Sequence, residues 1–280
     1  MKASLENHEF EKISELLATD SGIIIKPDQK YLVETRLRGF AKQREFNNFS
    51  ELYQRLVVNR EDFKYFVDLM TTNETLWFRD QSCWETLKHR ILPEFIRELE
   101  TGRQSITIWS AACSTGQEPY SLAIQIYELL KAKGKTALWP RFRILGTDLS
   151  DTVLQTAKGA IYDAFSIKRG LSSSRLHAYF EEREEGWALN EQIKEIVEFR
   201  PFNLMHSFLL LGRFDLILCR NVLIYFSEAT KLRLLDKFYQ SLAPNRYLMM
   251  GGTESIMGLK TKFETLAFDK AVFYQKSLKN

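Results

Sequence analysis

The feature that most constrains this chain is an alternation of strand-like and helix-like patterns that begins near residue 105. Short runs rich in β-branched and aromatic residues recur between helical patterns, at 106–109, 142–145, 196–199, 214–219 and 247–250. Pro119 suits the first turn of one such helix, which should run to about Lys131. This alternation predicts an α/β fold with a mostly parallel, doubly wound sheet. Two last runs, at 266–268 and 271–274, flank Asp269-Lys270 and predict a terminal antiparallel hairpin.

Residues 1 to about 70 carry only helical patterns. One apolar stripe at helical spacing consists of Val33, Leu37, Phe40 and Ala41. Ser50 is a candidate N-cap for a later helix, and Asn59 with Asp62 resembles a capping box. We therefore expect a small helical domain over residues 1–70.

The stretch from 171 to 195 interrupts the alternation. It is polar and rich in glutamate, and it is too long for an ordinary connection. We expect a small insertion there, built from a few antiparallel strands.

Composition excludes several classes of protein. The net charge of +3 over 280 residues creates no strong global field for nucleic acid. Three scattered cysteines without a CxxC pair or a signal peptide predict reduced thiols in a cytoplasmic protein. The four histidines lack metal-ligand spacing, and no apolar run approaches the ~20 residues that span a bilayer. We predict no metal site and no membrane insertion.

Ligands of doubly wound sheets bind beyond the carboxyl ends of the strands, so the residues there are candidates for a site. The first strand is followed by small residues from Ser110 to Gly116, which let backbone amides approach a ligand. This loop is not GxGxxG and has no phosphate-binding lysine, which argues against a P-loop. Glu118 either binds a cation such as an ammonium or only complements the helix dipole. Asp148, after the second strand, either accepts hydrogen bonds from ribose hydroxyls or caps the next helix.

Two further segments mix polar and aromatic groups. Arg220 and Asn221 end the 214–219 strand, and Tyr225 follows among apolar residues, where a tyrosine is usually part of the core. The segment from Thr71 to Arg79 has the composition of an ordered binding segment, although a capped helix start with Arg79 in a surface ion pair explains it too.

Five motifs in order resemble those of the chemotaxis receptor methyltransferases, the CheR family. Thr72-Asn-Glu-Thr-Leu-Trp-Phe-Arg79 resembles the TNxTxFFR signature, and the segment from Ser110 to Ser121 resembles the cofactor loop of that family. The other three are Gly146-Thr-Asp148, Phe202-Asn-Leu204 and the segment from Phe214 to Phe226. The resemblance runs from the helical domain to the last strand.

The resemblance implies a Rossmann-like class I methyltransferase domain with a small β-subdomain insertion, preceded by an all-α N-terminal domain. It divides the chain into a receptor-recognition domain (1–70), a linker that contributes to the cofactor site (71–88) and a methyltransferase domain (89–280) with a β-subdomain at about 171–200. The implied reaction is transfer of a methyl group from S-adenosylmethionine to glutamate side chains of methyl-accepting chemotaxis receptors, which leaves S-adenosylhomocysteine. The implied catalytic residues are Arg79 and Tyr225. The implied cofactor-binding residues are Asn73, Thr75, Arg79, Glu118, Asp148, Asn203, Leu204, Arg220 and Asn221.

Departures from the family pattern leave the cofactor-facing charges in place. Trp77, Cys113 and Gln117 stand where Phe, Ala and Glu are common. Gly251-Gly-Thr-Glu254 replaces Gly-His-Ser-Glu, so a family histidine is absent, and we assign this region no role.

The family meets its receptors through the second N-terminal helix, where Arg38 and Lys42 lie at i and i+4 with Arg36 beside them. A basic face suits an acidic helical bundle, although most such faces are merely solvated. Some members also dock on a receptor tail through a glycine-rich loop. Only Gly186 lies between His177 and Phe199, so we predict no such tether.

The resemblance implies a cytoplasmic enzyme recruited to receptor arrays. The alternatives are a class I methyltransferase with another substrate and a non-catalytic sensor of S-adenosyl ligands.

Overall fold

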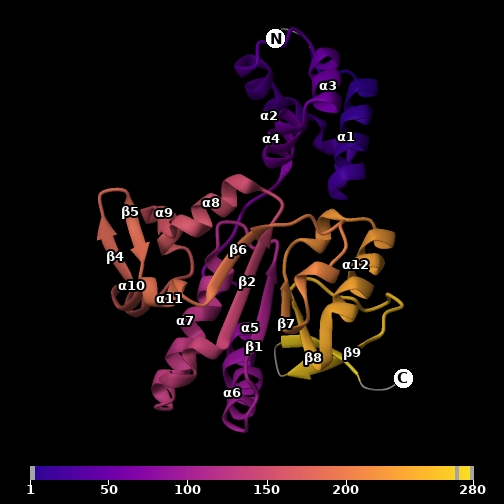
Figure 1. Cartoon of the computed structure of the whole chain (residues 1–280). Coiled ribbons are helices and arrows are strands. Elements are labelled where there is room, and N and C mark those ends of the chain that lie inside the picture. Colours follow the sequence, from indigo (N-terminus) through magenta and orange to yellow (C-terminus); the bar gives the residue numbers. More distant parts are fainter. Residues whose placement is uncertain (1–3, 269–270, 278–280) are drawn as a thin grey trace.

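The computed structural model describes residues 4–268 and 271–277, and Figure 1 shows a helical domain that stands above an α/β domain. The helical domain contains α1 (Asn7–Ser21), α2 (Lys30–Gln43), α3 (Phe49–Val58) and α4 (Arg60–Met70), with a short 3-10 turn at Pro27–Gln29. Its separate core includes the stripe expected on α2, whose four apolar residues are all buried. The predicted helical domain is therefore present.

The helix caps of this domain match the sequence only in part. Asn59 caps α4, where its side chain accepts a hydrogen bond from the Asp62 amide at 2.9 Å. Asn48, and not Ser50, caps α3. The Ser50 hydroxyl instead donates to Glu9 of α1 at 2.7 Å, because the packing of α1 against α3 offers it a carboxylate.

The described part of the second domain holds a seven-stranded sheet in the order β6-β2-β1-β7-β8-β10-β9. The strands are β1 (Ile106–Ala111), β2 (Phe142–Asp148), β6 (Val197–Pro201), β7 (Phe214–Cys219), β8 (Leu242–Met250), β9 (Phe263–Phe268) and β10 (Ala271–Lys276). Pairing is parallel from β6 to β8 and antiparallel for β10 with both neighbours. The doubly wound sheet and the final hairpin are confirmed, and its predicted turn at Asp269-Lys270 lies outside the described residues.

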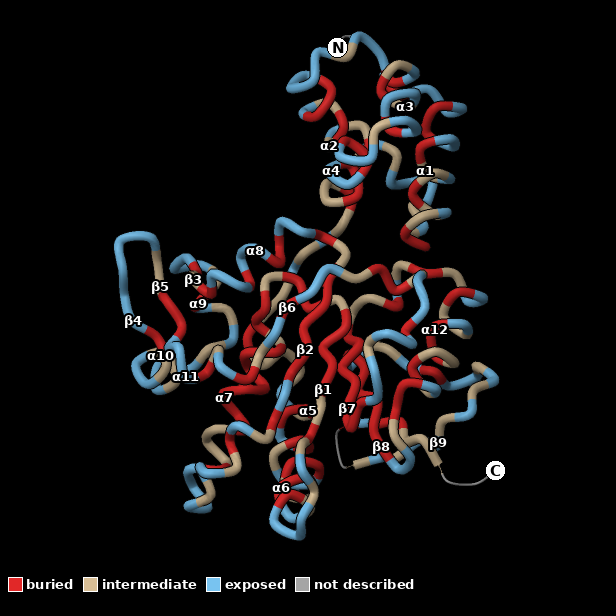
Figure 2. Tube along the Cα trace, viewed as in Figure 1, coloured by how far each residue is buried: buried red, intermediate tan, exposed pale blue. Residues whose placement is uncertain are grey.

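Two apolar cores cover the two faces of this sheet, and Figure 2 shows the central strands buried. Alternation along β1 sends Ile106 and Ile108 to one core, and Trp109 and Ala111 to the other. The first core receives α5 (Gln81–Thr86), α6 (Leu92–Glu100), α7 (Gln117–Ala132) and α8 (Asp151–Gly159), with π-helical residues Leu87–Ile91 and a 3-10 segment at Thr136–Arg141. The second receives α12 (Glu228–Ser241).

The insertion is a small antiparallel sheet in the order β3-β5-β4, beside α8 in Figure 1. Its elements are β3 (Ile161–Tyr162), α9 (Ala164–Lys168), α10 (Ser173–Tyr179), β4 (Phe180–Arg183), β5 (Gly186–Leu189) and α11 (Glu191–Lys194). The bounds expected for it, 171–200, are wrong at both ends. The two residues of β3, at 161–162, pair with β5 and are too few to show a sequence pattern. Residues 197–200 belong to β6 of the main sheet.

The linker is free of helix from Thr71 to Asp80 only, because Gln81 begins α5 and the following turns are buried in the first core. Trp77 fixes it to the insertion: its ring packs edge-on against Tyr162 and Phe180, with centroids 5.0 and 5.3 Å away. The expected linker range 71–88 is therefore too long at its carboxyl end. No helix in the described ranges is long and apolar enough to cross a membrane.

Candidate functional site

A cavity of about 1030 Å³, partly open to solvent, lies beyond the carboxyl ends of β1, β2 and β7, under the helical domain. It brings together all ten residues expected at the catalytic and cofactor site, namely Asn73, Thr75, Arg79, Glu118, Asp148, Asn203, Leu204, Arg220, Asn221 and Tyr225. Asn73 and Arg220, which are 147 positions apart in the sequence, thus line the same cavity.

The loop between β1 and α7 forms one wall of the cavity. Ala112 and Ser114 have positive φ angles of 58° and 51°, which non-glycine residues rarely adopt. The loop is held against β2, because the Cys113 amide donates to the Thr147 carbonyl at 2.9 Å and the Ser114 amide to Asp148 at 2.8 Å. Strained backbone of this kind persists where the surroundings fix it, often at ligand sites.

Asp148 is a nearly buried carboxylate at the end of β2. It accepts the amides of Ser114 and Ser150, at 2.8 and 3.0 Å. Burial raises its pKa above the ordinary value, although these amides oppose the shift. The N-cap of α8 is Ser150 and not Asp148, so the capping alternative is wrong. Two carboxylate oxygens offer about four acceptor positions, which leaves capacity for ligand hydroxyls.

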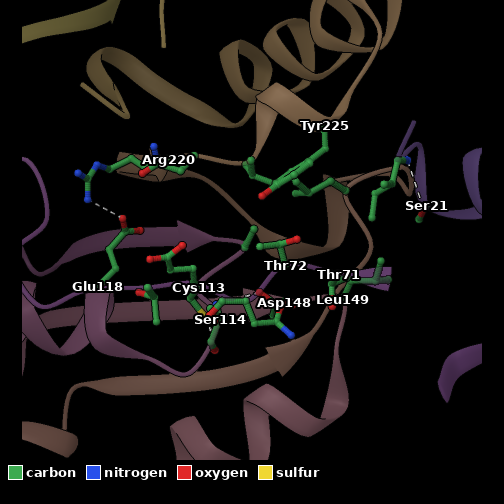
Figure 3. Close-up of a pocket in the computed structure, with 18 of the residues that line it drawn as sticks. Ser21, Thr71, Thr72, Cys113, Ser114, Glu118, Asp148, Leu149, Arg220 and Tyr225 are labelled. Carbon is green, nitrogen blue, oxygen red and sulfur yellow. Dashed lines mark hydrogen bonds and ion pairs between the residues drawn. The ribbon is translucent and has the colours of Figure 1, made fainter. Parts of the chain in front are cut away.

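Glu118 belongs to a buried charge cluster with Arg220 and Asp80. The Arg220 guanidinium donates to Glu118 at 3.0 Å, to Asp80 at 2.8 Å and to the Arg79 carbonyl at 2.6 Å. Its side chain is 2% exposed. Burial alone would lower the pKa of Arg220, but the two carboxylates outweigh burial and raise it. Figure 3 shows Glu118 and Arg220 together at one end of the pocket.

The contacts of Glu118 go beyond the helix dipole. The residue does lie in the first turn of α7, but its carboxylate is bound to Arg220 and to the Ser110 hydroxyl, the latter at 2.7 Å. Asp80, which the sequence did not single out, also accepts the Gly252 amide at 2.9 Å. Each of the two Glu118 oxygens accepts one of the bonds from Arg220 and Ser110, which leaves acceptor capacity for a cationic ligand group.

The helical domain contributes to the cavity through the end of α1 and the residues after it, another feature that the sequence did not reveal. Ser21 and Ile23 line the cavity, and the Ile24 amide donates to the Tyr225 carbonyl at 2.9 Å. Gly22 has a φ of 74°, and a Cβ there would lie 2.6 Å from the Met205 sulfur. The positive φ is what favours glycine here, because the flexible Met205 side chain can move away from a Cβ.

Tyr225 lies at the cavity and not in the core. It is half-buried, and its ring extends into the pocket in Figure 3. Arg79 also lines the cavity, so the interpretation of this segment as a capped helix start with a surface arginine is wrong. The core interpretation of the tyrosine is wrong as well.

The three basic residues expected to meet a receptor differ in their surroundings. Arg36 donates to the Met70 carbonyl at 2.9 Å, so its guanidinium binds the end of α4 within the chain. The Arg38 side chain is 40% exposed and pairs with Glu34 one turn earlier. Lys42 is exposed.

Two models of one protein family match the chain, one over the helical domain and one over the rest. Residues 8–71 match the model of the all-alpha domain of CheR methyltransferases, and residues 73–272 match that of their SAM binding domain. The chain belongs to the CheR methyltransferase family. It is 40% identical over 276 residues to chemotaxis protein methyltransferase Cher2 of Pseudomonas putida, covering 97% of this chain and 99% of that protein. It is also 40% identical over 274 residues to chemotaxis protein methyltransferase 1 of Pseudomonas aeruginosa, with the same coverage of both chains.

Membership of the CheR family makes this chain a methyltransferase of the class I fold with S-adenosylmethionine as its cofactor. The residues of the cavity fit that cofactor. Asp148 has acceptor capacity for hydroxyl groups, and Glu118 has acceptor capacity for an ammonium. The Arg220 Nε is a buried donor without a protein partner among the described residues.

Proposed function

We propose that this CheR protein esterifies glutamate side chains on the cytoplasmic helical bundle of chemotaxis receptors, and so serves chemotactic adaptation. The observation that carries the proposal is the cavity itself. All ten catalytic and cofactor-binding residues expected from the family motifs line it. The near full-length similarity of this chain to chemotaxis protein methyltransferases supports the same assignment.

Bound S-adenosylmethionine supplies a methyl group on a positively charged sulfur. A glutamate acceptor is already ionised at neutral pH, so no residue of the chain has to remove a proton. The task of the protein is to hold the carboxylate in line with the reacting methyl group. We assign this orienting role to Arg79 and Tyr225, which both line the cavity.

Water exclusion is the second task of the chain. Because a cation and an anion become neutral products, a drier site favours the reaction. Asp148, Asn203 and Arg220 are buried, and the hydrogen bond from the Ile24 amide to the Tyr225 carbonyl joins the helical domain to one side of the cavity. We propose that these features limit water near a bound cofactor. Excess positive charge near the acceptor would stabilise its ground state. Arg220 is paired with Glu118 and Asp80, which leaves Arg79 as the cation that we assign to the acceptor.

We assign cofactor contacts by the chemistry of each end of the cavity. Asp148 would accept the ribose hydroxyls, and Glu118 would attract the ammonium of the methionine portion. Asn73 and Thr75 of the linker, with Asn203, Leu204 and Asn221, complete the proposed cofactor-binding wall.

For the receptor we propose docking through Arg38 and Lys42 on the solvent side of α2, which would bring the enzyme to receptor arrays. Arg36 is omitted from this surface because it binds the end of α4. We also propose that the protein needs no receptor-tail tether, since the turn between β4 and β5 spans only Glu184 and Glu185.

The deciding experiment incubates the protein with methyl-labelled S-adenosylmethionine and purified receptor cytoplasmic fragments, followed by mild alkali. Label on the receptor that leaves as methanol supports glutamate esterification. Alkali-stable label would mean another acceptor group. No turnover on any receptor, with cofactor binding intact, would favour a sensor. Tyr225→Phe and Arg79→Ala should each reduce turnover, and full activity in both would refute their assigned roles.

A further inference from the structure

The turn after β8, residues 251–254, is held against the loop that leaves β7. The Glu254 carboxylate accepts three backbone amides: Asn221 at 2.6 Å, Gly251 at 2.9 Å and Leu223 at 3.1 Å. Two of these amides belong to the cavity loop and one to the turn itself. A single side chain therefore joins the exits of two neighbouring strands.

The loop that Glu254 holds has a conformation that requires support. Asn221 has a φ of 59°, in the left-handed region that costs an ordinary residue free energy. Successive amides in such a conformation form a concave anion-binding nest. Here the anion is the Glu254 carboxylate, which approaches the nest from the side of the turn.

The turn is built for close approach. A Cβ on Gly251 would lie 2.8 Å from both the Asn221 side-chain nitrogen and the Glu254 carboxylate. On the other side, the Gly252 amide donates to Asp80, which also binds Arg220. The turn is thus tied to the loop at Asn221 and to the charge cluster through Asp80.

We infer that Glu254 is a positioning residue of the cofactor site: it fixes the Arg220–Asn221 end of the cavity from behind the loop. This inference rests on the cofactor and on the proposed placement of its amino-acid portion at the Glu118 and Arg220 end, and not on the acceptor. In Figure 3, Asp148 and Leu149 lie further along the pocket, away from the Glu118 and Arg220 end. Loss of Glu254 should therefore affect the amino-acid portion of the cofactor more than its adenosine portion.

The test is calorimetric binding of two ligands to Glu254→Gln. S-adenosylhomocysteine has both portions, and 5′-methylthioadenosine lacks the amino-acid portion. A glutamine offers one acceptor oxygen to three donors, and hydrogen bonds to a charged group are the stronger kind. We expect binding of S-adenosylhomocysteine to weaken about tenfold or more and binding of methylthioadenosine to change less than about twofold.

Controls separate positioning from folding. Glu264→Gln removes an exposed carboxylate on β9 and should leave both affinities unchanged. Glu254→Asp keeps the charge and should restore part of the affinity for S-adenosylhomocysteine. If Glu254→Gln fails to fold, Gly251→Ala tests the same loop, because its Cβ would press on Asn221.

Unchanged binding of S-adenosylhomocysteine would overturn the inference. Equal weakening of both ligands would also overturn it, because that pattern indicates general damage to the cavity. Neither result depends on receptor methylation, so the proposed acceptor can fail while this inference stands.

Discussion

Replacement of Arg220 by methionine removes the cation from a buried cluster of three charges. The guanidinium bridges Glu118 and Asp80, at 3.0 and 2.8 Å. Methionine retains an apolar side chain of similar length, so the change isolates the loss of charge and hydrogen bonds. Both carboxylates are then left without their common cation.

The magnitude follows from the burial of the three groups. The side chains of Arg220, Glu118 and Asp80 are 2%, 12% and 29% exposed. Breaking a buried ion pair by removal of one partner costs about 3–5 kcal/mol. Because Asp80 keeps some contact with water, we expect the lower end, about 3 kcal/mol. A domain of this size should then lose roughly 6–12 °C in Tm.

The pKa of Asp80 predicts how this loss of stability varies with pH. Burial pushes the pKa of Asp80 upward, but the Gly252 amide and Arg220 outweigh burial and hold it below the ordinary value. A depressed folded-state pKa stabilises the fold above the unfolded-state pKa of about 3.9, and this contribution is lost as pH falls through the folded value. The loss of folding stability caused by Arg220→Met should therefore be largest near neutral pH and become smaller below about pH 4.

The assay is thermal unfolding followed by circular dichroism at several pH values. The matched control is Arg183→Met, which removes an exposed guanidinium whose pair with Glu181 is 53% and 73% exposed. Exposed pairs contribute little, so this control should shift Tm by no more than about 2 °C. An Arg220→Met protein as stable as the control, or one whose deficit grows in acid, would refute the reasoning.

Three further predictions concern the cavity and the helical domain. Burial raises the pKa of Asp148, so acidification should weaken binding of S-adenosylhomocysteine at a higher pH than it would with an ordinary aspartate. Asp148→Asn should weaken this binding and make the affinity, measured by calorimetry, less dependent on pH. Gly22→Ala should lower stability by about 1–3 kcal/mol because of its positive φ, whereas Gly39→Ala, in open space on α2, should raise it by about 0.5–1 kcal/mol in denaturant unfolding. Charge reversal of Arg38 and Lys42 to glutamate should raise KM for receptor fragments several-fold and leave cofactor affinity unchanged; unchanged KM would remove α2 from the docking surface.

The site was predictable wherever a motif lies at the carboxyl end of a strand. Asp148 and Arg220 follow strong β patterns, and parallel strands bring their carboxyl ends to one edge. Resemblance to the family added the linker residues Asn73 and Arg79, which no local pattern places near that edge. Asp80 and Glu254 escaped prediction because each acts on backbone amides far away in sequence, as the pairs Asp80–Gly252 and Glu254–Asn221 show.

The sequence by itself determined the class of fold, the helical domain and the cofactor, because apolar periodicity and short motifs are local properties of the chain. Only the tertiary structure decided which partners each charge has. Arg36 was predicted to face a receptor and instead binds the end of α4, and Ser50 was predicted to cap a helix and instead binds Glu9. Residue type sets what a side chain can donate or accept, but the packing of distant segments sets what lies within its reach.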